Sequence, residues 1–93
     1  MTINIFVAKT NRYLMNVNNA NFRRLYDFLY PCLPFEFTIS SGTLNLEDMP
    51  ALRNKLLDLI DAKTTGDYEH RKCIELFLLV SYAEQQNKPI FLG

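Results

Sequence analysis

The chain has 93 residues, of which 48% are apolar, and its 10 basic residues are matched by 10 acidic ones. This length suits one domain over residues 1–93 with a single hydrophobic core. The 7 phenylalanines and 5 tyrosines exclude a disordered chain. The even charge balance argues against nucleic acid as the main partner, because duplex binding needs an excess of Lys and Arg.

The pattern of apolar residues gives no sign of a membrane segment or a signal peptide. The longest uninterrupted apolar run, Leu76–Val80, is far too short to span a bilayer. Met1–Ala8 lacks a basic start. The only cysteines are Cys32 and Cys73, fewer than a disulfide framework normally uses. We therefore expect a reduced cytoplasmic protein with no membrane partner.

The first part of the chain predicts a β-hairpin. Ile3, Ile5 and Val7 alternate with their neighbours at the period of a strand. Residues 9–11 form a candidate turn, and Arg12–Val17 predicts a second strand. The short connection favours antiparallel pairing of the two strands.

A helix is predicted to begin at Asn18, whose side chain can cap a free backbone N–H. Val17 and Phe22 are spaced for a hydrophobic staple across this start. The helix ends before Pro31, because the residue that precedes a proline avoids the α region. Its predicted buried face consists of Phe22, Leu25, Tyr26 and Leu29.

A third strand and a second helix follow. Phe35, Phe37 and Ile39 alternate as in a strand, and residues 40–42 form a candidate turn. The second helix is expected between Leu46 and Ala62. Two caps are open to it, Asn45 and Asp48, and Pro50 favours the later one because proline is best tolerated in the first turn. The apolar face of this helix is predicted to be Leu52, Leu56, Leu59 and Ile60.

The third helix is predicted from about Asp67 to Gln86, after a break at residues 64–66. Its middle, Ile74–Ala83, is apolar on nearly every side, so we expect this part to be buried all round. Either the helix is central in the domain or part of it faces another subunit. Ile90–Leu92 can add a final strand.

The expected element order is therefore β-β-α-β-α-α-β. This order predicts a two-layer α+β domain, in which a small antiparallel sheet of about four strands packs against three helices.

One pair of residues could act as a nucleophile and a base. His70 is the only histidine, and Cys73 lies on the same helical face three residues later. No glycine-rich turn that could form an oxyanion hole precedes Cys73. A structural zinc site needs about four ligands in paired spacings, and only Cys32 could join these two residues. We expect no catalytic residues and no metal site, and a small Cys73–His70 enzyme is the weaker alternative.

Nucleotide cofactors are not expected either. The 3 glycines cannot form a P-loop or a dinucleotide-binding fingerprint. Glu47 and Asp48 suit a helix start, and Asp58 and Asp61 suit a solvated helix face, so these acids do not indicate a catalytic pair.

The most unusual local feature is a cluster of asparagines followed by two arginines. Asparagine side chains both donate and accept hydrogen bonds, and exposed Tyr and Arg are enriched in protein interfaces. We expect a partner-binding surface here that is formed by Tyr13, Asn18, Asn19, Asn21, Arg23, Arg24 and Tyr30.

Three short motifs span most of the chain. They are Leu14-x-x-x-Asn18-x-Ala20-Asn21-x-x-x-Leu25, Gly42-Thr43-Leu44 before a leucine-rich helix, and Lys88-Pro89-Ile90. Together they resemble a pattern seen in small uncharacterised phage and prophage proteins. The resemblance implies a mobile-element origin, and small phage proteins of this size are often host-directed binders, including inhibitors of host defence. It implies no catalytic residues.

The leading functional hypothesis is thus a non-enzymatic protein-binding module, of the phage-encoded accessory or inhibitor kind. The second is a homodimer whose third helix completes a shared core. The Cys73–His70 enzyme and weak nucleic-acid binding through Arg12, Arg23 and Arg24 are the remaining alternatives.

Overall fold

The computed structural model describes residues 2–7, 14–18, 24, 27–29, 42–63 and 65–92. Within them, residues 24 and 27–29 are helical. The elements with defined bounds are β1 (Thr2–Val7), β2 (Leu14–Asn18), β3 (Gly42–Leu44), the 3-10 turn η1 (Leu46–Asp48), α2 (Met49–Ala62), α3 (Asp67–Gln86) and β4 (Ile90–Leu92). The predicted α+β class is confirmed.

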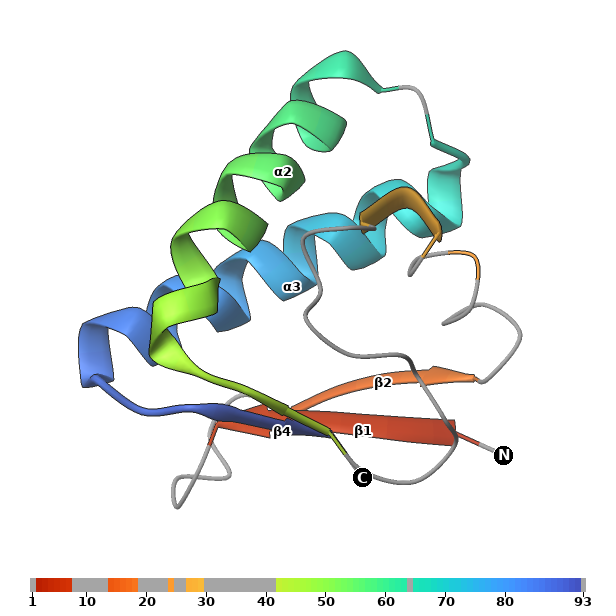
Figure 1. The fold of residues 1–93 in the computed structure, drawn as a ribbon. Helices are drawn as coiled ribbons and strands as arrows, with labels where there is room; N and C mark the ends of the chain where they lie inside the picture. The colour runs from red at the N-terminus through yellow and green to blue at the C-terminus, as the bar shows by residue number, and fades with distance from the viewer. Residues whose placement is uncertain are drawn as a thin grey trace.

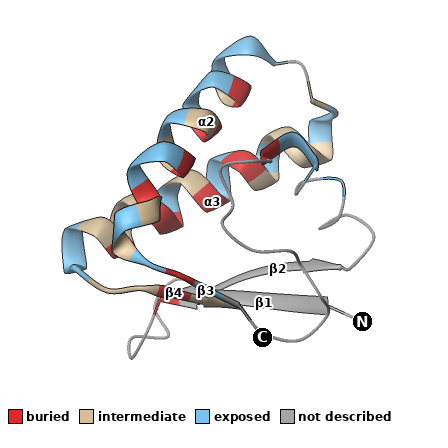
Figure 2. Cartoon of the chain, viewed as in Figure 1, coloured by how far each residue is buried: buried red, intermediate tan, exposed pale blue. Residues whose placement is uncertain are grey.

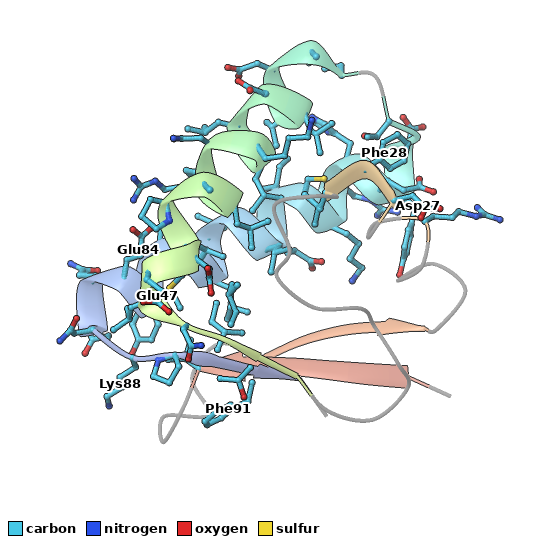
Figure 3. The ribbon with its side chains drawn as sticks, in the orientation of Figure 1. Asp27, Phe28, Glu47, Glu84, Lys88 and Phe91 are labelled. Atoms are coloured by element: carbon cyan, nitrogen blue, oxygen red, sulfur yellow. The ribbon has the colours of Figure 1, made fainter. Side chains whose placement is uncertain are left out.

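The strands form one antiparallel sheet in the order β2-β1-β4-β3. β4, from the end of the chain, lies between β1 and β3. One row across it consists of Val7, Ile90 and Leu44, which are paired in register and all buried. α2 and α3 lie on the same side of this sheet (Figure 1). Phe91 points away from the helices on the opposite side (Figure 3).

Two expectations about the strands need correction. Asn18, the predicted helix cap, is the last residue of β2 and pairs with Thr2. Gly42, predicted to lie in a turn, begins β3 and pairs with Leu92. Pairing with the neighbouring strand β1 includes Asn18, and pairing with β4 from the end of the chain includes Gly42; such pairing overrides local preference. The third expected strand, at residues 35–39, lies outside the described residues.

The start of α2 lies in the region that the candidate caps, Asn45 and Asp48, indicated. Asn45 precedes η1 and Asp48 precedes α2, and Pro50 lies in the first turn of α2. The Asp48 N–H donates to the Asn45 carbonyl oxygen at 3.1 Å, which closes η1. The Met49 N–H donates to the Leu46 carbonyl oxygen, which links η1 to the first residue of α2. The buried residues of α2 are Met49, Leu52, Leu56 and Leu59, so the predicted apolar face is correct except at the half-buried Ile60.

α3 has the bounds that the sequence predicted. It ends at Asn87, which adopts the left-handed region with φ of 59°, and the Lys88 N–H then donates to the Ala83 carbonyl oxygen at 3.0 Å. This is the usual way in which a helix satisfies its last carbonyl groups. Pro89 follows, and the chain enters β4.

The hydrophobic core lies between the sheet and the two helices. The buried residues of α2 and α3 occupy the sides that face each other and the sheet (Figure 2). The largest fully buried side chains are those of Leu29, Met49, Leu52, Leu56, Leu79, Ile90, Val7, Val80 and Cys73. Leu29 shows that the helical residues 27–29 contribute to the same core, as the sequence predicted for this residue.

Candidate functional site

α3 is not buried all round, contrary to the expectation for Ile74–Ala83. Leu78 keeps 53% of its surface exposed and Ile74 keeps 37%. The opposite side of the helix is buried at Cys73, Leu76 and Val80. The reason is geometric, because the sheet and α2 together cover only part of the circumference of α3. The exposure of Ile74 and Leu78 shows that the helix is not enclosed within the domain, and whether this side faces another subunit stays a prediction.

The outward side of α3 forms a continuous surface of four exposed residues, which we call the outer stripe: Arg71, Ile74, Glu75 and Leu78. At about 100° per residue, these four positions fall within roughly 100° of the helix circumference. Ile74 and Leu78 are one turn apart, so their side chains are neighbours. The outer stripe therefore presents an apolar pair with one positive and one negative charge beside it.

Two polar contacts between α2 and α3 hold the outer stripe in place. Arg53 Nη1 lies 2.6 Å from Glu84 Oε1, and His70 Nε2 lies 3.2 Å from the carbonyl oxygen of Ile60. Glu84 lies beside the first turns of α2 (Figure 3). Because the contacts join the start of α2 to the end of α3, and the end of α2 to the start of α3, they fix the two helices in an antiparallel arrangement.

The geometry at Cys73 does not favour a nucleophile. The side chain is fully buried. Burial, and secondly the negative charge of Glu69, raises the pKa of the Cys73 thiol to about 11. A reactive cysteine needs a lowered pKa and access to solvent. The neighbouring His70 is engaged with the Ile60 carbonyl through Nε2, which is a packing role.

Of the predicted partner-binding residues, Arg24 is the one whose side chain the structure describes. It is 68% exposed, and its Nη1 lies 3.7 Å from Glu69 Oε1. Glu69 and Leu78 are nine residues apart on α3, which is two and a half turns, so they point to opposite sides of the helix. Arg24 is therefore not part of the outer stripe.

The other predicted partner-binding residues are Asn18 and five residues that the structure does not describe. Asn18 has its backbone in β2. The remaining five lie outside the described residues: Tyr13, Asn19, Asn21, Arg23 and Tyr30.

The part of the chain that the structure describes holds neither a metal-binding cluster nor a helix that could span a membrane. No three His, Cys, Asp or Glu side chains there are grouped so that they could hold a metal ion. Among the same residues, no helix has the length and apolar character needed to cross a membrane.

The sequence itself contains a signal for the outer stripe. Arg71, Glu75 and Gln85 share the helical side of Ile74 and Leu78, and polar residues on both ends of an apolar pair indicate a side that faces water. The dense apolar run around this pair concealed the signal.

A scan against protein-family models, a search of curated proteins and a search of solved structures each found no match to this chain.

Proposed function

We propose that this protein is a non-enzymatic protein-binding module, and that it binds its partner through the outer stripe of α3. The observation that carries the proposal is the exposure of Leu78 and Ile74 side by side on an otherwise well-packed helix. Single exposed apolar residues are common on protein surfaces and indicate nothing. Two of them one helical turn apart, with charged residues around them, have the composition of a small interface.

The rigidity of α3 supports the same proposal. Its inner side is anchored in the core by Leu76, Leu79 and Val80, and its two ends are held to α2 by the Arg53 and His70 contacts. A surface on a rigid helix loses little conformational entropy when it binds a partner. The outer stripe is therefore ready to bind without rearrangement.

The raised pKa of Cys73 supports the non-enzymatic part of the proposal, because the thiol remains protonated at neutral pH. A host-directed accessory or inhibitory role is part of the proposal on the strength of the resemblance to phage proteins alone. The partner-binding surface around Arg24 that the sequence predicted is the competing placement.

Affinity capture from a lysate of the native source tests the placement. The tagged wild type is compared with Leu78→Glu, and Ala51→Glu, at an exposed position on α2, is the matched control. We expect capture of a defined protein by the wild type and by the control, and its loss with Leu78→Glu. If Arg24→Glu abolishes capture and Leu78→Glu does not, the outer stripe is the wrong surface.

A further inference from the structure

The charges of the outer stripe have a regular arrangement. Arg71 and Glu75 are exposed, opposite in sign and one helical turn apart, with Ile74 between them. Glu75 Oε2 also lies 2.9 Å from Lys72 Nζ. This pair is partly exposed to solvent, so it adds little stability and leaves Glu75 able to accept a second cation. Because the outer stripe carries one positive and one negative side chain, it does not favour a partner surface with an excess of either charge.

Building on the proposed function, we propose that the protein bound at this surface is a second copy of the same chain, with α3 packed antiparallel against α3 about a two-fold axis. A two-fold interface is formed by the same patch on both copies, so the patch must complement itself. The outer stripe has this property, because a two-fold rotation reverses the direction of the helix. Arg71 of one copy therefore comes to lie near Glu75 of the other.

The register follows from helix geometry. With the axis beside Ile74, the Ile74 side chains of the two copies meet. Arg71 then lies only about 3 Å along the helix from Glu75 of the second copy, a distance within the reach of an arginine side chain. Leu78 lies beside the aliphatic stem of the second copy's Arg71, which can cover apolar surface. One register therefore satisfies the apolar pair and both charges.

Two further features favour the antiparallel pairing. It sets the positive N-terminal end of each helix macrodipole toward the negative C-terminal end of the other. A specific interface needs about 800 Å² from each partner, which is about one seventh of the 5666 Å² surface of the chain. The outer stripe forms the centre of such a contact. Interfaces of this size have dissociation constants from about micromolar to picomolar.

Sedimentation equilibrium of the purified full chain, from about 1 µM to about 500 µM, measures the dimer. We expect Leu78→Glu to be monomeric and Ala51→Glu to dimerise like the wild type. Arg71→Glu and Glu75→Arg each place like charges opposite one another, so each should weaken the dimer at least about tenfold. The double variant Arg71→Glu/Glu75→Arg restores opposite charges across the axis and should recover most of the wild-type affinity.

A wild type that stays monomeric throughout this range overturns the inference, as does a dimer that Leu78→Glu leaves intact. Failure of the double variant to regain affinity overturns the antiparallel register. The proposed function fails separately: a monomeric chain that captures another protein in a Leu78-dependent way keeps the proposed function and excludes the second copy as its partner. A monomer that captures nothing contradicts both.

Discussion

Lys63 ends α2 in the left-handed region of backbone space, with φ of 52° and ψ of 39°. Its N–H donates to the Leu59 carbonyl oxygen at 3.1 Å, so this conformation closes the helix. A side chain with a Cβ atom costs about 1–2 kcal/mol in this region, whereas asparagine tolerates it better. Asn87 occupies the equivalent position after α3 and is the better suited of the two.

Replacing Lys63 with glycine should therefore stabilise the fold. Glycine removes the backbone strain but adds entropy to the unfolded chain, which leaves a net gain of about 0.5–1 kcal/mol. Asn87→Gly should gain less. Urea unfolding at one fixed protein concentration measures both. A Lys63→Gly protein that unfolds at a lower urea concentration than the wild type contradicts this account of the helix end.

Cys73 links stability to alkaline pH. Its folded-state pKa of about 11 lies above the value of an unfolded thiol, so the folded state holds its proton more tightly. This contribution is complete below about pH 9 and is lost as the pH rises toward 11, at about 1.4 kcal/mol per pH unit. The difference in unfolding free energy between wild type and Cys73→Ala should shrink across this window. If the difference in unfolding free energy between the two proteins stays constant between pH 8 and 11, this prediction is wrong.

At the scale of elements, α2 and α3 were predictable because their signals are local. Apolar residues at helical spacing, Pro50 in a first turn, and Pro89 after Asn87 mark these helices in the sequence itself. Strand boundaries at Asn18 and Gly42 were not, because each is set by pairing with another strand: β1 in the case of Asn18 and β4, far away in the chain, in the case of Gly42. Local preference at an asparagine or a glycine points away from a strand, and only the fold shows which partner is present.

Neighbouring leucines on α2 test the orientation of this helix. Leu56 is fully buried, and Leu57 is 38% exposed. Leu56→Ala should lower the free energy of unfolding by about 2–5 kcal/mol, because it leaves a cavity in the core. Leu57→Ala should change it by less than about 1 kcal/mol. Thermal or urea unfolding of the two variants side by side measures the contrast, and similar losses in both would show that α2 is rotated from the position described.

At the scale of the whole molecule, α3 serves two surfaces. Its inner side joins the sheet to α2, and its outer side presents Ile74 and Leu78 to solvent. These two surfaces explain the long apolar run in the sequence of α3, because both the inner and the outer side carry apolar residues. The sequence indicated that the helix is apolar on most sides, but which side faces outward depends on where the sheet and α2 pack. Only the three-dimensional arrangement identifies the outer stripe.

The outer stripe is the surface through which the chain is proposed to bind its partner. Photo-cross-linking tests it most directly, with a benzophenone amino acid at position 78 and, as a control, at the exposed position 51 on α2. In cells of the native source, we predict a defined adduct from position 78 and none from position 51. An adduct of twice the mass of the chain identifies a second copy, and one of any other mass identifies a different protein partner. No adduct from position 78, or equal adducts from both positions, would contradict the claim that α3 carries the binding surface.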